Sequence, residues 1–212
     1  MEVNTLATEI GEIIQDETYG ATWIIGKFNE ALMMVATVCR IPGLQGVATL
    51  SIPVSAKSVP MPVSYLHDLY LVTSSTYPNG VLIAPNLKEL TTNSDNEATG
   101  PVAMVAVDGR VLNVRPMSEA AEDLVLHFYK KPVELEAGDD FPSYIPEAFQ
   151  REIFRNFVLR EAYLQIEDGV DKNATNTQNY SALFAGGLAA MVAFYPNAPK
   201  SRPEIKRIWR DY

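Results

Sequence analysis

The sequence predicts an α+β fold: a four-helix bundle built from N- and C-terminal helices, with an inserted antiparallel β lobe and an extended C-terminal arm. Three observations support this prediction. Apolar residues recur at helical spacing near both ends of the chain. Residues 46–135 instead alternate between apolar and polar and are interrupted by turn residues. Residues 196–212 contain three prolines and no sustained apolar stripe. The predicted division is 1–45 with 146–195 for the bundle, 46–145 for the β lobe and 196–212 for the arm.

Two helices are predicted before residue 45, over residues 5–15 and 22–40. Thr22 is expected to cap the second helix through its hydroxyl, and Pro42 to end it because proline lacks an amide donor. Their apolar faces need a partner, and the helices after residue 145 are the only ones available, which favours one bundle. The apolar positions with helical spacing are Leu6, Ile10, Ile13, Ile14, Ile24, Phe28, Ala31, Leu32, Val35 and Val38.

Strand patterns fill the middle of the chain. Residues 47–54 alternate, and residues 65–73 and 124–129 are rich in strand formers. The Asp108-Gly109 pair lies between two apolar runs and predicts a two-residue type I′ hairpin turn, in which both residues have positive φ. Residues 91–98 carry no apolar anchor and are expected to form an exposed loop.

Two further helices are predicted after residue 145. Pro146-Glu147 suits the first turn of a helix, where proline loses no hydrogen bond and a carboxylate faces the positive end of the dipole. Gly186-Gly187 lies within the last helix and is better explained by close helix packing than by phosphate binding. The predicted stripes are Phe149, Ile153, Phe157 and Leu164 in one helix, and Tyr180, Leu183, Gly187, Leu188, Met191 and Phe194 in the other.

Composition excludes several classes of protein. Cys39 is the only cysteine, so an intrachain disulfide and a cysteine-based zinc site are impossible, and we expect a buried core thiol. The N-terminus has no basic residue, which argues against a secretory signal, and the longest apolar run, 182–194, is too short to span a bilayer. A soluble protein with no membrane contact, assembled in a cytoplasm, is therefore expected.

Catalytic and metal-binding patterns are weak. His67 and His127 lie in separate strand-like runs with no second histidine at helical spacing, and no nucleotide-binding or nucleophile-elbow motif occurs. Asp139-Asp140 follows Gly138, where a turn explains the two carboxylates, although a carboxylate-dependent cell-wall hydrolase stays as an alternative. We therefore expect no catalytic residue, no metal and no cofactor.

The arm is the candidate binding site. It carries five basic and two acidic residues, a net charge of +3, which leaves −12 on residues 1–195 of the total −9. An acidic body argues against tight nucleic-acid binding, whereas a basic arm favours an acidic partner. A frayed tail is the alternative, but aromatic and arginine side chains are typical of interface hot spots. The predicted partner-binding residues are Lys200, Arg202, Ile205, Lys206, Arg207, Ile208, Trp209, Arg210 and Tyr212.

The chain resembles the head-to-tail adaptor (gatekeeper, or head-completion) proteins of tailed bacteriophages, especially those of short-tailed phages. The resemblance covers roughly residues 4–195. It depends on the order and spacing of four segments: Phe28-Asn29-Glu30-Ala31-Leu32, Thr99-Gly100-Pro101 leading into the hairpin that ends at Pro116, Leu126 to Pro132, and Ile145-Pro146-Glu147-Ala148-Phe149.

The resemblance implies a structural, non-enzymatic virion protein at the head–tail junction, assembled in the bacterial host. It implies a homo-oligomeric ring, expected to be a dodecamer, beneath the portal protein, with the tail nozzle or tail tube protein as a second partner. DNA is expected to pass through the channel without sequence-specific binding. The alternative within phage structure is another tail or head-completion subunit that does not contact the portal.

Overall fold

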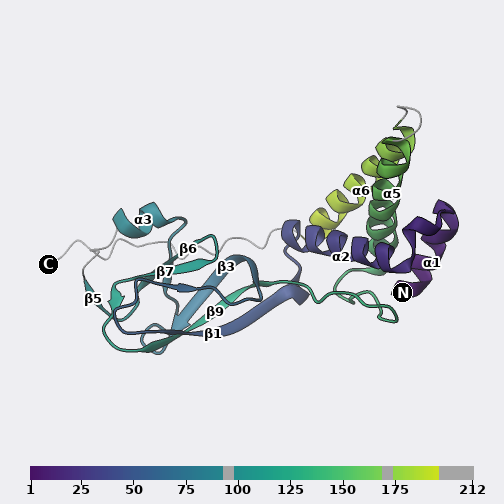
Figure 1. The fold of residues 1–212 in the computed structure, drawn as a ribbon. Helices are drawn as coiled ribbons and strands as arrows, with labels where there is room; N and C mark the ends of the chain where they lie inside the picture. The colour runs from purple at the N-terminus through teal and green to yellow at the C-terminus, as the bar shows by residue number, and fades with distance from the viewer. Residues whose placement is uncertain (93–97, 169–173, 196–212) are drawn as a thin grey trace.

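The computed structural model describes residues 1–92, 98–168 and 174–195. It is an α+β protein, which confirms the predicted class, and its helical and β parts lie side by side (Figure 1). The helical part contains α1 (Val3–Ile14), α2 (Ala21–Val38), α4 (Glu147–Gln150), a π-helical turn (Arg151–Arg155), α5 (Asn156–Asp168) and α6 (Thr175–Phe194). Two 3-10 turns, Glu17–Tyr19 and Pro42–Leu44, flank α2.

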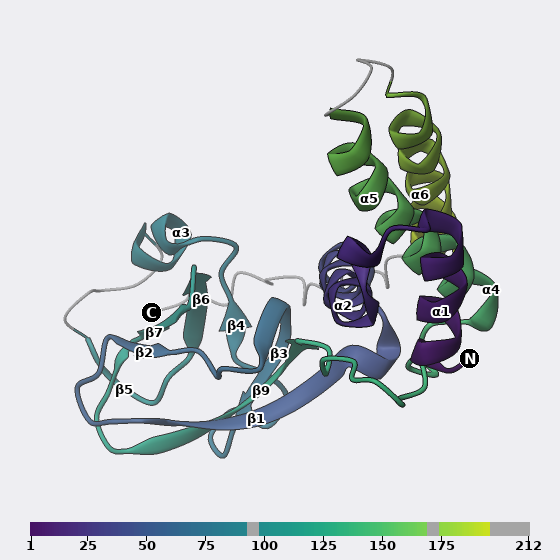
Figure 2. The same ribbon diagram turned by 45° about the vertical axis from the view of Figure 1, so that its right-hand side comes forward.

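α5 and α6 form a hairpin, whereas α2 lies across the ends of these two helices, with α1 beside it (Figures 1 and 2). All four long helices contribute to one apolar core. Phe28 of α2 is fully buried at its centre, edge-on to Phe154 at 5.9 Å and to Phe141 at 5.3 Å between ring centroids. Burial of each such side chain contributes about 1.5–3 kcal/mol, so this core fixes the helical part.

Several predicted helical positions differ from the structure. Gly20, not Thr22, precedes α2, because the 3-10 turn held by the Asp16 carboxylate brings the chain to the helix earlier. Leu164, Leu183 and Phe194 were predicted on buried stripes but are 51%, 48% and 56% exposed. The side chains that α6 buries are Phe184 and Met191, together with Gly187, so its inward face is narrow.

The β part consists of three small sheets. Their strand orders are β1-β9-β3, β2-β7-β6-β4 and β5-β8. The lobe is not wholly antiparallel as predicted, since β4 runs parallel to β6 and β5 parallel to β8. The strands are β1 (Gln45–Ile52), β2 (Ser58–Pro60), β3 (Tyr65–Ser74), β4 (Leu82–Ile83), β5 (Thr99–Gly100), β6 (Met104–Asp108), β7 (Val111–Arg115), β8 (Met117–Ser118) and β9 (Glu122–Lys130).

Two local predictions in this lobe are corrected. Asp108 pairs with Val111, so the central hairpin residues are Gly109 and Arg110, and only Gly109 has positive φ, at 59°. Glycine at the first central position is the pattern of a type II′ turn, not the predicted type I′. In addition, the predicted loop begins inside a helix, α3 (Leu87–Thr92), whose Leu90 is fully buried.

A separate apolar core holds the β lobe together. Fully buried residues of both larger sheets meet there, among them Ile52, Val72, Leu112 and Leu126. The alternation in β1 and β9 therefore has the expected cause: one face of the β1-β9-β3 sheet covers this core, and the other faces outward.

The chain between β9 and α4 packs against the helical part. Asn29 of α2 holds Leu135 by two hydrogen bonds, accepting from its backbone N–H at 2.7 Å and donating to its carbonyl oxygen at 3.1 Å. The N-terminus pairs with the same segment, since Phe141 donates its backbone N–H to Met1 and Val3 donates to Asp139. This return segment thus fixes the β lobe to the helices at a second point besides β1.

Candidate functional site

The predicted partner-binding residues, Lys200 to Tyr212, lie outside the described residues. The structure does fix where the chain leaves α6. The Tyr195 hydroxyl donates to the carbonyl oxygen of Tyr144 at 2.7 Å, and its backbone N–H donates to Met191 at 3.0 Å. Burial raises the pKa of Tyr195, and the nearby Cys39 thiol raises it further. The last described residue is therefore anchored beside the end of α2.

The C-terminal part of α6, from Ala182 to Phe194, presents an outward face made only of apolar residues, whereas the first turns of the helix expose polar ones. We call this apolar face the α6 strip. In an ordinary amphipathic helix of a monomer the outward face is polar, and a contiguous exposed apolar patch marks an interaction site. Small side chains dominate the strip, so another backbone can approach α6 closely. The exposed residues of the strip are Ala182, Leu183, Ala185, Gly186, Ala189, Ala190, Ala193 and Phe194.

The two adjacent glycines of α6 have different surroundings. A Cβ atom at Gly187 would lie 3.4 Å from Ile153 and 3.6 Å from Glu152, so this glycine packs against the π-helical turn. A Cβ atom at Gly186 would meet nothing within 4 Å. The prediction of close helix packing therefore describes Gly187, whereas Gly186 belongs to the exposed strip.

A second exposed apolar surface lies along α2. It is a shallow, largely open surface, and all its lining residues belong to α2. Met34 is 40% exposed and Val38 53% exposed, although both lie on the helix that carries the core residue Phe28. We call this surface the α2 groove; its lining residues are Glu30, Met33, Met34, Thr37 and Val38.

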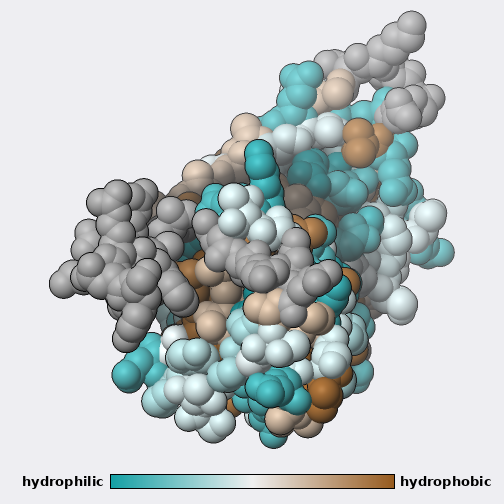
Figure 3. Space-filling view, turned by 90° about the vertical axis from the view of Figure 1, so that its left-hand side faces the viewer, coloured by the Kyte–Doolittle hydropathy of each residue, from teal (hydrophilic) through white to brown (hydrophobic). Residues whose placement is uncertain are grey.

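The β lobe has a mixed surface in comparison. Hydrophilic residues cover most of the face shown in Figure 3, and hydrophobic residues appear singly or in small groups. On the outward side of the β1-β9-β3 sheet, Val47 pairs with His127, which in turn pairs with Leu71. Val47 is 62% exposed and Leu71 36% exposed. This is a smaller apolar area than the α6 strip and is interrupted by a histidine.

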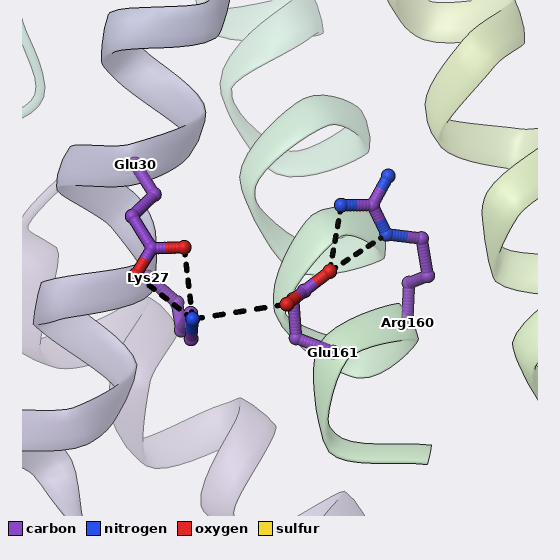
Figure 4. Close-up of polar contacts among 4 residues, drawn as sticks. All are labelled: Lys27, Glu30, Arg160 and Glu161. Atoms are coloured by element: carbon purple, nitrogen blue, oxygen red, sulfur yellow. Dashed lines mark hydrogen bonds and ion pairs between the residues drawn. The ribbon is translucent and has the colours of Figure 1, made fainter. Parts of the chain in front are cut away.

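Charged residues join α2 to α5. Lys27 donates to both carboxylate oxygens of Glu30 at 2.8 Å and lies 3.7 Å from Glu161, and Arg160 donates to Glu161 at 2.7 Å (Figure 4). The Arg160 guanidinium also lies over the Phe157 ring, at 4.5 Å from its centroid. These pairs neutralise one another, so their role is to hold the two helices together and not to attract a ligand.

A polar cluster connects the end of α2 to β3. His67 Nε2 lies 2.8 Å from the carbonyl oxygen of Ala36, and the imidazole stacks on the Tyr129 ring at 5.2 Å. The next residue, Asp68, pairs with Arg40. His67 is therefore held by structural contacts, through a hydrogen bond of its ring nitrogen and stacking of the ring.

The other residues considered for chemistry also have structural roles. Asp139 accepts the backbone N–H of Glu136 at 2.8 Å and so closes a turn, and Asp140 lies 3.8 Å from the N-terminal amine. Cys39 is 1% exposed, as predicted, and burial raises the pKa of its thiol. Within residues 1–92, 98–168 and 174–195, His, Cys, Asp and Glu side chains form no group of three or more that could hold a metal. None of the described helices is long and apolar enough to cross a membrane.

Sequence reasoning missed both exposed surfaces. It placed Val38 of α2 and Leu183 and Phe194 of α6 on buried stripes, although all three are exposed, because a helix can bury only part of its circumference against one core. The available signal was the breadth of the apolar pattern in α6, where residues 182–194 are apolar on all sides.

The chain matches a known protein family. The model of a protein family described as "SU10 adaptor protein" matches residues 1–204. No curated protein sequence matches the chain.

Proposed function

The chain belongs to the SU10 adaptor protein family, and from this membership we propose that it forms a ring beneath the portal protein of a tailed phage. It is a structural adaptor and a component of the virion. In the proposal the ring binds the portal on one side, carries the tail nozzle or tail tube protein on the other, and surrounds the channel for DNA. The family match over residues 1–204 is the observation that carries this proposal.

We assign the ring contacts to the helical part. The α6 strip is exposed, apolar and rich in small residues, which is what a closely packed contact between neighbouring subunits requires. Residues 1–45 and 146–195 form one bundle-like unit in this arrangement, which faces the adjacent subunits of the ring and the portal. Residues 46–145 form the lobe that faces the tail, and the arm, 196–212, binds the portal through its basic and aromatic residues.

Charge supports the channel role. Residues 1–195 carry a net charge of −12. A wall of this sign repels phosphate, so DNA slides along it and does not adhere. The channel therefore requires no sequence-specific contact, in keeping with the structural character of the family.

The test removes the arm. A chain that ends at Pro196 keeps every described residue, so it should show the circular dichroism and thermal unfolding of the full protein. In native mass spectrometry, the full chain alone should appear as a 23.4 kDa monomer. After addition of the cognate portal, the full chain should appear as a ring–portal complex. The shortened chain should not bind.

Two outcomes contradict the proposal. Unimpaired portal binding by the shortened chain would remove the arm from the interface. Cross-linking of assembled particles that joins this chain to tail proteins, and never to portal, would make it a tail or head-completion subunit instead.

A further inference from the structure

We propose that in the free subunit the arm folds back over its own α2, where Ile205, Ile208 and Trp209 cover the α2 groove. The proposed function concerns the assembled ring, whereas this inference concerns the chain before assembly. It rests on the proposed function only for the identity of the partner that later displaces the arm.

The arm begins beside one end of α2. Tyr195 is held by Tyr144 and Met191, and packs against the same apolar core as Cys39. Cys39 is the C-cap of α2 and directly follows Val38, the last residue of the groove. The arm therefore begins next to one end of the surface that it is proposed to cover.

The arm is long enough to reach every part of the groove. Ten residues from Pro196 to Ile205 extend at most roughly 33–36 Å. The groove runs from Glu30 to Val38 along one helix, a length of about 12 Å. The apolar residues of the arm can thus reach any part of the groove with slack. A tether of this length also gives an effective concentration in the millimolar range, well above that of a second molecule in dilute solution.

The residues of the groove are chemically complementary to the apolar residues of the arm. Met33 and Met34 line the groove, and unbranched thioether side chains adapt to aromatic and branched partners. Met34 and Val38 expose apolar surface to water, and contact with Trp209 of the arm would remove that surface from water. Glu30, at the far end of the groove, is neutralised by Lys27, so the complementarity is apolar and not electrostatic. These features match the aromatic and branched residues of the arm.

Docking in this way would regulate assembly. A partner that binds the arm must first displace it from α2, so the apparent affinity for that partner is the intrinsic affinity multiplied by the fraction of undocked chains. Displacement then exposes the groove. A subunit would present both surfaces only where the partner is already in place, which suppresses premature assembly.

The test isolates Trp209 by fluorescence. Trp23 and Trp209 are the two tryptophans, and Trp23→Phe leaves Trp209 as the single emitter. Acrylamide quenching of this variant is compared with that of a free peptide of residues 196–212. A docked-to-free ratio of about tenfold, equivalent to about 1.4 kcal/mol, should reduce quenching severalfold relative to the peptide.

Two matched double variants locate the docking surface. Met34→Asp with Val38→Asp places two charges in the groove and should restore peptide-like quenching. Val47→Asp with Val54→Asp places two charges at sites of the β lobe that are 62% and 56% exposed, and should leave the protection unchanged. Circular dichroism verifies folding of both double variants.

Three results would overturn the inference. Quenching equal to that of the free peptide would show that the arm is not docked. Protection that survives both groove substitutions would place the arm elsewhere. Protection that grows with protein concentration would mean that the arm binds a second copy. No portal is present in these measurements, so their failure would leave the proposed ring function to its own test.

Discussion

Arg40 Nε lies 2.5 Å from Asp68 Oδ2, and this ion pair joins the end of α2 to β3. Asp68 has a left-handed backbone, with φ at 49°, and lies where the pairing of β3 with β9 is irregular between His67 and Leu71. The irregularity directs the Asp68 side chain toward α2, while His67 meets Ala36 of the same helix. One bulge in a strand therefore supplies two contacts between the helical core and the β lobe.

Substitutions at Asp68 should separate charge from backbone conformation. Asp68→Asn removes the ion pair but tolerates the left-handed region, so we expect a loss of about 0–1 kcal/mol in the free energy of unfolding. Asp68→Ala also removes the ion pair, and alanine has no polar side chain that could hydrogen-bond locally in the left-handed region. We therefore expect it to cost about 1–2 kcal/mol more than Asp68→Asn. Urea unfolding of the two variants measures the difference. Equal destabilisation by Asn and Ala would mean that the backbone conformation at this position carries no cost.

Gly43 and Gly186 should respond to alanine in opposite directions. A Cβ atom at Gly43 would lie 2.5 Å from Tyr144 Cβ, so Gly43→Ala forces the return segment away from α2 and should cost about 1–3 kcal/mol. Gly186 is helical with open space around it, so Gly186→Ala should stabilise the monomer by up to about 1 kcal/mol. Thermal unfolding checks both signs, and a neutral Gly43→Ala would contradict the close approach of Tyr144.

Much of the fold could be predicted from periodicity. The α+β class and the order of the main elements are confirmed, because each long helix and strand buries one face against a core and so repeats its apolar residues at a fixed interval. The resemblance to phage head-to-tail adaptors is confirmed by the family match. A regular four-helix bundle and the role of the arm stay predictions.

The failures have physical causes. α3 was missed because only Leu90 anchors it, although Asn86 caps it by accepting the backbone N–H of Glu89, a signal that the sequence contains. The parallel pairing of β4 with β6 depends on contacts between distant segments, which alternation cannot indicate. The exposed α6 strip was missed for a different reason: apolar residues that bind another molecule and those that form the core look alike in one sequence.

The start of α6 should be sensitive to pH through Glu167. Burial opposes ionisation of this carboxylate, but its hydrogen bonds with Thr177 and Asn176 outweigh burial and lower its pKa below the ordinary value of 4.5. Its oxygens accept the backbone N–H groups of Asn176 and Thr177, both at 3.0 Å, which are amides that the helix itself cannot satisfy.

A lowered folded-state pKa stabilises the fold above the unfolded value. The contribution of Glu167 should therefore be complete above pH 4.5 and should disappear as the pH falls through the lowered pKa. Glu167→Gln should accelerate amide hydrogen exchange at Asn176 and Thr177 at neutral pH. At a pH below both values the variant and the natural chain should differ much less. A difference that is independent of pH would show that charge is not the source of the effect.

The α6 strip can be tested with two leucines of similar exposure on adjacent helices. Leu183 lies in the strip and is 48% exposed, whereas Leu164 of α5 is 51% exposed beside the polar residue Gln165. Aspartate at either position leaves the core intact, so both variants should be folded monomers whose free energy of unfolding lies within about 0.5 kcal/mol of that of the natural chain.

Only Leu183→Asp places a charge in the proposed contact between subunits. Native mass spectrometry with portal should therefore show full rings for Leu164→Asp and incomplete or absent rings for Leu183→Asp. Normal rings with Leu183→Asp would exclude the α6 strip as the subunit contact, because an unpaired carboxylate cannot be buried in a closely packed apolar interface without a large desolvation cost.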